Sequence, residues 1–229
     1  MKRCLLCQQL LCWQPDMKWL FSRRSAITPP ICSWCQQQFV PIEKTQACPG
    51  CAYPGTGGEV CLDCQRWQRT KQLLHNQALY RYKTPAMVDF FERYKFHGDY
   101  RLRWVFAAAY QKLVRQYPRR QWLYVPIPVD KETFANRGFN QVVGLCPELR
   151  LTDCLRVIQT KGRIKQSHKN RIERLQTPQP FALNATVDLH NKQIVLLDDI
   201  YTTGQTLYHA QAVLVAAGAR VVRAVTLAR

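Results

Sequence analysis

The sequence of 229 residues contains no apolar run that approaches the length of a membrane-spanning helix. It also lacks an apolar leader, since it begins Met1, Lys2, Arg3 and Cys4. These two absences argue against membrane insertion and against export, and we therefore expect a cytoplasmic protein. In that reducing compartment disulfide bonds are not expected to hold the fold together.

Acidic residues are scarce, because 15 Asp and Glu stand against 33 Lys and Arg and give a formal net charge of +18 at pH 7. The residues after Arg66 carry an excess of 15 positive charges, from 26 basic and 11 acidic residues. This balance favours a polyanion partner, and nucleic acid is the polyanion that we expect. The alternative is that many of these side chains only solvate the surface. Contacts to phosphates would weaken steeply as the salt concentration rises.

Cysteine is rare after residue 64, where only Cys146 and Cys154 occur. Each is expected to be a small buried apolar side chain rather than a nucleophile. Eight of the other nine cysteines form four CxxC pairs: Cys4 and Cys7, Cys32 and Cys35, Cys48 and Cys51, Cys61 and Cys64. A thioredoxin-like redox centre needs one such pair and does not explain four. Two thiolates on one tight turn supply adjacent corners of a zinc tetrahedron, and a second hairpin would complete the site.

Four CxxC pairs predict two structural zinc ions in a loop-rich domain that spans residues 1–66. Sequential closure would give a double zinc ribbon, with one ion held by Cys4, Cys7, Cys32 and Cys35 and the other by Cys48, Cys51, Cys61 and Cys64. Interleaved closure stays open at this point. Most zinc ribbons are structural scaffolds, so no catalytic role is expected for the metal. A polar linker over residues 67–77 would lead into a second domain over residues 78–229.

Short apolar runs alternate with helical patterns in the second domain. Strands are predicted at 78–82, 123–127, 155–158, 194–197 and 221–227, and helices at 85–94, 100–117, 140–149 and from Thr206 to a stop at Gly218. Strands that alternate with helices imply a parallel sheet. We therefore expect an α/β fold, with a parallel sheet flanked by helices, behind the small zinc-ribbon domain.

The most informative segment is residues 195–206, in which a buried strand leads into two acids and a short polar loop. Asp198 and Asp199 would lie at the carboxyl edge of the sheet, where open α/β sheets place their ligands. Adjacent carboxylates accept hydrogen bonds from vicinal hydroxyls, and the helix after the loop adds its positive end. The loop residues are Tyr201, Thr202, Thr203, Gly204, Gln205 and Thr206. This pattern predicts a site for a phosphorylated ribose, and the alternative is an ordinary strand-to-helix turn with a threonine N-cap.

A basic tract lies between Thr160 and Arg174. Its basic residues are Lys161, Arg163, Lys165, Lys169, Arg171 and Arg174. The composition predicts a mobile loop that enters a short helix. Its charges would close over a pyrophosphate or follow a nucleic-acid backbone, and inert solvation is the alternative.

The segment at 195–206 resembles the ribose-phosphate motif of type I phosphoribosyltransferases. The four CxxC pairs, Val-Pro-Ile-Pro at 125–128, Arg-Gly-Phe-Asn-Gln at 137–141, the tract at 166–174 and the loop at 198–206 together resemble the ComF family over nearly the whole chain. That resemblance implies a cytoplasmic bacterial protein that acts in natural transformation and handles incoming single-stranded DNA. It also implies a partner, the helicase ATPase ComFA.

The resemblance further implies roles for individual residues. Asp198 and Asp199 would hold the 2′ and 3′ hydroxyls of phosphoribosyl pyrophosphate or a related ribose phosphate, and residues 201–206 would hold the 5′-phosphate. The pyrophosphate side, with Mg²⁺ nearby, would be bordered by Arg137, Gly138, Asn140 and Gln141.

Two other functions compete with this interpretation. A nucleotide-salvage phosphoribosyltransferase would use the same pocket to transfer phosphoribose to a base, but no segment identifies an acceptor base and zinc ribbons are superfluous for that chemistry. A purely structural RNA-associated zinc protein would leave the acid pair unexplained. Whether transfer is catalysed must be argued from the site rather than from the fold.

Overall fold

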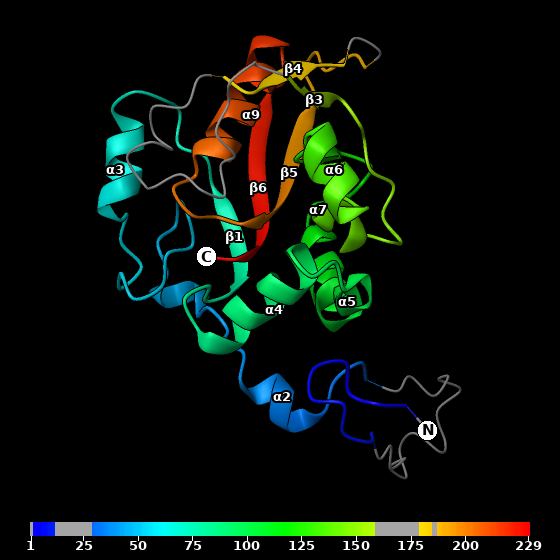
Figure 1. Cartoon of the computed structure of the whole chain (residues 1–229). Helices are drawn as coiled ribbons and strands as arrows, with labels where there is room; N and C mark the ends of the chain where they lie inside the picture. Colours follow the sequence, from blue (N-terminus) through cyan, green and yellow to red (C-terminus); the bar gives the residue numbers. More distant parts are fainter. Residues whose placement is uncertain (1, 12–28, 159–178, 185–186) are drawn as a thin grey trace.

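A four-stranded parallel sheet forms the centre of the protein, in a computed structural model that describes residues 2–11, 29–158, 179–184 and 187–229. The strand order is β1 (Asn76–Tyr80), β6 (Val221–Ala228), β5 (Gln193–Ile200) and β2 (Trp122–Pro126) (Figure 1). All three neighbouring pairs are parallel, which confirms the predicted α/β fold. Strand β5 has a partner on both sides, and this interior position explains its continuous apolar run.

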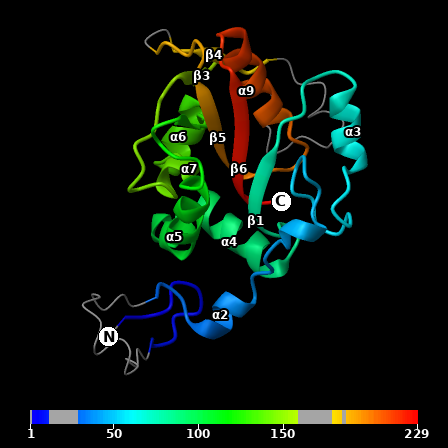
Figure 2. The same cartoon turned by 180° about the vertical axis from the view of Figure 1, so that it is seen from behind.

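Both faces of β5 are buried, because successive side chains of a strand point in opposite directions. Val195 and Leu197 pack into a core with helices α4 (Pro85–Lys95) and α5 (Arg103–Val114). Ile194 and Leu196 pack into a second core with helix α9 (Gln205–Ala216). Helices α4 and α5 therefore lie on one side of the sheet and α9 on the other, as the reverse view shows (Figure 2).

The remaining elements are short. They include four helices: α2 (Ser33–Gln37), α3 (Leu62–Gln68), α6 (Lys131–Arg137) and α7 (Gln141–Gly144). They also include 3₁₀ turns at Lys44–Gln46 and Tyr100–Leu102 and a small antiparallel pair of strands, β3 (Leu155–Val157) and β4 (Phe181–Leu183). Helix α9 ends where Gly218 takes φ +89°, as its glycine predicts. In the part of the chain that the structure describes, no helix has both the length and the apolarity needed to cross a membrane.

Three predicted elements differ from the structure. The strand predicted at 155–158 forms, but as β3 it pairs with β4 outside the parallel sheet. The helix predicted at 140–149 is the single turn α7. Helix α6 was not predicted, because it buries no residue and therefore shows no apolar periodicity. Its start is marked by Asp130, whose side chain accepts a hydrogen bond from the Thr133 N–H at 2.7 Å.

The cysteine-rich segment is packed against the sheet domain at several points. The chain at residues 40–42 lies beside β1, since the Ile42 N–H donates to the Leu79 carbonyl at 2.8 Å and the Arg81 N–H donates to the Val40 carbonyl at 2.9 Å. Strand β1 begins at Asn76, two residues before the predicted strand and inside the predicted linker. The division of the chain at residues 66 and 77 stays a prediction.

Candidate functional site

The acid pair lies inside β5, near its carboxyl end, because the strand continues to Ile200. Asp198 and Asp199 are both buried, with 7% and 4% of their surfaces exposed. The Tyr110 hydroxyl donates to the backbone carbonyl of Asp198 at 2.9 Å and fixes the strand at this point. Burial, together with the neighbouring Asp199, raises the pKa of Asp198 from 3.8 to about 8. The pair therefore holds a proton near neutral pH.

A lysine that the sequence did not link to the acid pair forms an ion pair with Asp199. Lys95, the last residue of α4, places its Nζ 2.7 Å from Asp199 Oδ2 and 4.8 Å from the centre of the Phe91 ring. Both charged side chains are largely buried, with 15% and 6% exposed. Ribose hydroxyls that bind Asp199 must therefore compete with Lys95 or share the carboxylate with it. No local sequence pattern links Lys95 to the acid pair, because it is simply the last residue of a core helix.

The segment predicted to border pyrophosphate brings one positive charge, that of Arg137, within electrostatic range of the acid pair. Arg137 ends α6 and donates through Nη1 to Gln141 Oε1. Burial lowers the pKa of Arg137, while Asp199 opposes that shift, so the guanidinium lies within electrostatic reach of Asp199. Gly138 follows with φ +81° and ends α6. Arg137 is thus the residue of this segment best placed to meet an anion beside the acids.

The side chain of Asn140 is used in backbone contacts that the sequence did not predict. Its Oδ1 accepts from the N–H groups of Val142 and Val143, at 2.8 and 3.2 Å, and so caps α7. Its Nδ2 donates to the Ile127 carbonyl at 3.0 Å. These contacts hold the segment at 138–141 against the end of β2.

The loop from Tyr201 to Thr206 divides into buried and accessible side chains. Tyr201 and Gln205 are 2% and 7% exposed, and Gln205 Nε2 lies 2.6 Å from His209 Nε2. Thr202 is exposed, whereas Thr203 and Thr206 are half-buried. Gly204 opens α9 without a side-chain cap. The groups that face an incoming anion are therefore the threonine hydroxyls and the N–H groups of the first helical turn.

We expect Gly204→Ala to disable this loop. Gly204 has φ +81°, and an added Cβ would overlap the Tyr201 hydroxyl and approach its Cε1 to 3.0 Å. The left-handed conformation and the overlap together should destabilise the fold by about 2 kcal/mol. The control is Gly55→Ala, where φ is +78° but nothing lies within 4 Å of the added Cβ. Thermal melts of both variants test this, and equal losses would show that the overlap with Tyr201 is relieved without cost.

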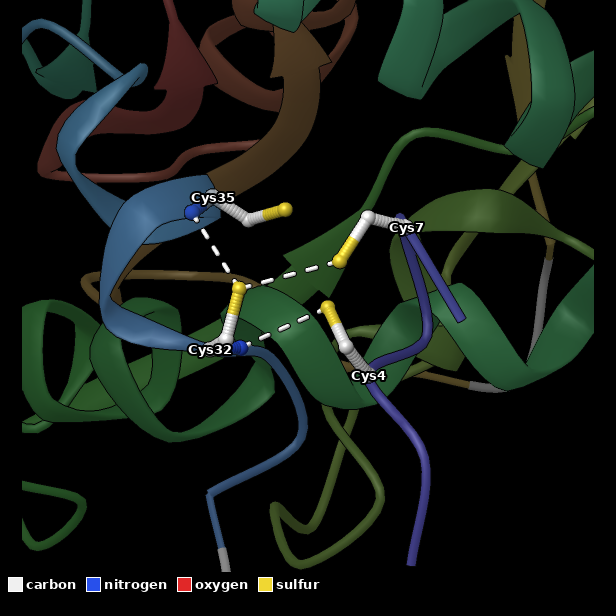
Figure 3. A group of neighbouring side chains, drawn as sticks. All are labelled: Cys4, Cys7, Cys32 and Cys35. Carbon is white, nitrogen blue, oxygen red and sulfur yellow. Dashed lines mark hydrogen bonds between the residues drawn. The ribbon is translucent and has the colours of Figure 1, made fainter. Parts of the chain in front are cut away.

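The cysteines of the four CxxC pairs gather in two clusters of four. In each cluster the four Sγ atoms lie within 4.8 Å of one another. The clusters are Cys4, Cys7, Cys32 and Cys35, drawn in Figure 3, and Cys48, Cys51, Cys61 and Cys64. We name them the first and the second tetrad. The structure thus confirms sequential closure of the four pairs.

The sulfur spacing fits tetrahedral zinc. Four thiolates at ~2.3 Å from one ion would stand ~3.8 Å apart. The Cys7 and Cys32 sulfurs are 3.7 Å apart, and the Cys51 and Cys61 sulfurs are 3.6 Å apart. Both tetrads can therefore bind zinc, which would crosslink two distant chain segments at each site.

Each tetrad joins one hairpin to one helix start, and the prediction that a second hairpin completes the site was wrong. Tight turns hold the first pairs, since the Cys4 N–H donates to the Gln9 carbonyl at 2.8 Å and the Cys48 N–H donates to the Tyr53 carbonyl at 2.9 Å. The second pairs open α2 and α3, with Cys32 and Cys61 at the N-cap positions. Helix starts suit this role because their N–H groups face the thiolates.

The structure tests the prediction for the two cysteines after residue 64 but not the prediction for the basic tract. Cys146 and Cys154 are buried, which confirms the prediction that both are small buried side chains, and burial raises the pKa of their thiols to about 12 and about 11. The six basic residues predicted to contact nucleic acid lie outside the described residues: Lys161, Arg163, Lys165, Lys169, Arg171 and Arg174.

Comparison with known proteins fits this arrangement. Residues 106–229 match the family model of the phosphoribosyl transferase domain, and this region contains the acid pair, its loop and Arg137. The competence protein ComFC of Streptococcus pneumoniae is 37% identical over 227 residues, which covers 99% of this chain and all of the relative. The chain belongs to the ComFC family of competence proteins. The ComFC of Bacillus subtilis is 32% identical over 212 residues, covering 90% of this chain and 86% of the relative. Membership of the ComFC family confirms the resemblance found in the sequence.

Proposed function

We propose that this ComFC-family chain binds phosphoribosyl pyrophosphate, or a related ribose phosphate with Mg²⁺, and handles incoming single-stranded DNA in the cytoplasm during natural transformation. The helicase ATPase ComFA is its proposed partner. The observation that carries the first half is the buried pair Asp198 and Asp199, followed directly by the loop at 201–206 and the start of α9, inside a phosphoribosyl transferase domain.

The chemistry of the site suits a sugar with an anion at each end. Carboxylates of the acid pair accept from vicinal hydroxyls, and the start of α9 offers N–H groups to a terminal phosphate. Lys95 adds a positive charge in contact with Asp199, and Arg137 adds one within electrostatic range of it. Mg²⁺, when bound, would neutralise the pyrophosphate. These groups support ligand binding whether or not transfer follows.

Calorimetric titration of phosphoribosyl pyrophosphate with Mg²⁺ tests this half. We expect saturable binding that requires Mg²⁺ and disappears in the double variant Asp198→Asn/Asp199→Asn. The matched control is Asp153→Asn, an exposed acid outside the pocket, which should bind as the unaltered protein does. Binding that survives the double variant would move the ligand elsewhere.

An exposed group of aromatic and basic side chains supports the second half. The Arg103 guanidinium carbon lies 3.8 Å from the centre of the Tyr100 ring and 4.5 Å from that of Trp104. Both rings are exposed, at 41% and 46%, and Phe96 nearby in sequence is 65% exposed. The Tyr100 ring also contacts Phe139, next to the Arg137 segment, with ring centres 4.7 Å apart. Bases of a single strand stack on such rings, and the guanidinium favours the phosphates.

We expect Tyr100→Ala and Trp104→Ala each to weaken single-stranded oligonucleotide binding about tenfold, since one stacked base contributes ~1–3 kcal/mol. Fluorescence anisotropy at several salt concentrations measures this. Trp34→Ala is the control, because Trp34 is 63% exposed but lies on α2. A loss confined to Trp34→Ala would move the DNA surface to the first tetrad, and binding insensitive to salt would remove the electrostatic argument.

Nucleotide salvage is the second candidate, and the match to the phosphoribosyl transferase domain favours it. It requires release of pyrophosphate that depends on an added base and stops in Asp198→Asn/Asp199→Asn. A scan of the common bases that releases no pyrophosphate would exclude it in favour of binding alone.

A further inference from the structure

Arg229 joins the second tetrad to the loop beside the acid pair. Its Nη1 donates to the Tyr201 and Thr202 carbonyls, at 3.2 and 2.7 Å, and its Nη2 donates to Cys51 Sγ at 3.5 Å. The guanidinium lies between the Tyr53 and Tyr201 rings, with its carbon 4.9 and 4.8 Å from their centres. One side chain thus contacts a metal-ligating sulfur and two consecutive loop carbonyls.

The backbone of Arg229 fixes the position from which this side chain reaches. Its N–H donates to the Tyr80 carbonyl at 2.9 Å, and its carbonyl accepts from the Tyr82 N–H at 2.8 Å. Arg229 is therefore held at the end of β1 on one side while its guanidinium spans the tetrad and the loop. Such a residue transmits the position of one partner to the other.

Trp67 provides a second link from the same tetrad. It lies on α3, three residues after Cys64, and its Nε1 donates to the Thr203 carbonyl at 3.1 Å. Its ring stacks on Tyr208 of α9 with centres 4.2 Å apart. Three consecutive loop carbonyls, from Tyr201 to Thr203, thus accept hydrogen bonds from Arg229 or Trp67.

The second tetrad is itself anchored in the sheet. Buried Asn76 on β1 donates through Nδ2 to the Cys51 carbonyl at 3.3 Å and to Thr226 Oγ1 of β6 at 3.0 Å. The first tetrad is docked elsewhere, because Arg93 of α4 donates to the Leu5 and Leu6 carbonyls at 3.0 and 3.2 Å. The second tetrad is therefore fixed to strands of the sheet, whereas the first is fixed to helix α4.

We infer that the second tetrad sets the conformation of the phosphate loop, and that Arg229 and Trp67 are the positioning residues through which it acts. Zinc at Cys48, Cys51, Cys61 and Cys64 would hold both α3 and the Cys51 sulfur in place. These residues occupy the three loop carbonyls with hydrogen bonds and so fix the backbone that carries the threonine hydroxyls. A cysteine module is thereby part of the ribose-phosphate site without touching the ligand.

Hydrogen exchange of the zinc-loaded, ligand-free protein tests this. Arg229→Gln and Trp67→Phe should speed exchange at residues 202–208 about tenfold or more, leave exchange in β2 unchanged and keep the zinc content of the unaltered protein. Controls are Arg69→Gln, an exposed arginine at the end of α3, and Trp34→Phe on α2. Arg229→Lys keeps the charge but cannot span the sulfur and both carbonyls, and should give an intermediate rate. Unchanged loop exchange in Arg229→Gln and Trp67→Phe would overturn the inference.

A matched pair of ligand variants assigns the effect to one tetrad. Cys32 and Cys61 hold the same N-cap position in the first and second tetrads. Cys61→Ser should speed loop exchange, whereas Cys32→Ser should not. Equal effects of the two replacements would contradict a role specific to the second tetrad.

The consequence for ligand binding rests on the proposed function. Titration of phosphoribosyl pyrophosphate with Mg²⁺ should give a dissociation constant raised about tenfold in Arg229→Gln and unchanged in Arg69→Gln. If the unaltered protein does not bind this ligand, the proposed function fails, while the exchange experiment still decides whether the tetrad positions the loop. If the ligand binds and Arg229→Gln leaves its affinity unchanged, the tetrad does not serve the site.

Discussion

Asp198→Asn will raise the thermal stability of the protein at pH 8, although it removes a residue of the proposed site. The pKa of Asp198 lies near 8 in the folded protein, against 3.8 without the fold, because burial and Asp199 disfavour its charged form. Between these values the folded protein keeps a proton that the unfolded chain has released. The stability contributed by this proton is complete below pH ~4 and is lost as the pH rises through ~8. Asparagine stays neutral, so a shift of about four pH units puts the gain at pH 8 at no more than ~5 kcal/mol.

Asp199→Asn will act in the opposite direction. It leaves the largely buried Lys95 ammonium without the carboxylate that lies 2.7 Å away. Removing one partner of a buried ion pair destabilises a fold by roughly 3 kcal/mol, because the remaining charge stays desolvated. The second replacement in Lys95→Met/Asp199→Asn removes that charge and should recover most of the loss. Two neighbouring Asp→Asn changes are therefore expected to shift the melting temperature with opposite signs.

Thermal melts at pH 5 and pH 8 measure both effects. The gain from Asp198→Asn should be smaller at pH 5, where the folded protein still keeps the proton, and both variants should lose ribose-phosphate binding. A lower melting temperature for Asp198→Asn at pH 8 would show that its carboxylate is stabilised in the pocket, and the proposed proton on the pair would then be wrong.

The sequence predicts those parts of the fold that depend on neighbouring residues. The apolar run at 194–197 identifies β5, because only an interior strand buries both of its faces. The CxxC spacing identifies the tetrads, since a tight turn is enough to place two sulfurs at one ion. The placement of β3 fails because its partner β4 lies more than twenty residues away and nothing in the pattern of residues 155–158 shows the pairing.

At the candidate site, too, the sequence predicts contacts between neighbouring residues but not contacts between distant ones. Asp198 and Asp199 are adjacent, so the sequence alone identifies their motif. Lys95 reaches them from a helix about a hundred residues earlier. Trp67 approaches the loop from a helix that precedes it in the chain, and Arg229 from the strand that follows it. Their contacts arise from the packing of distant elements. A single sequence therefore gives the residues that meet the ligand but not those that neutralise or position them.

Removing zinc from the second tetrad will cost more stability than removing it from the first. Cys48, Cys51 and Cys64 are at most 2% exposed and belong to the core that α9 forms with the sheet. In the first tetrad Cys4 and Cys35 also belong to a core, but two cysteines, Cys7 and Cys32, are half-buried, against Cys61 alone in the second. The segment of the first tetrad is docked on α4. A chelator should therefore reach the first ion sooner, and release of the second should open the core beneath α9.

We expect two zinc ions per chain by elemental analysis and a biphasic release to a chromogenic chelator. Cys51→Ser should lower the melting temperature by roughly 10 °C or more, because structural zinc contributes a large part of the folding free energy, whereas Cys7→Ser should lower it by less. Both variants should retain one ion, and that result separates a local loss of metal from general unfolding. A folded protein without zinc, or a larger loss in Cys7→Ser than in Cys51→Ser, would contradict the view that the second tetrad continues the core of the sheet.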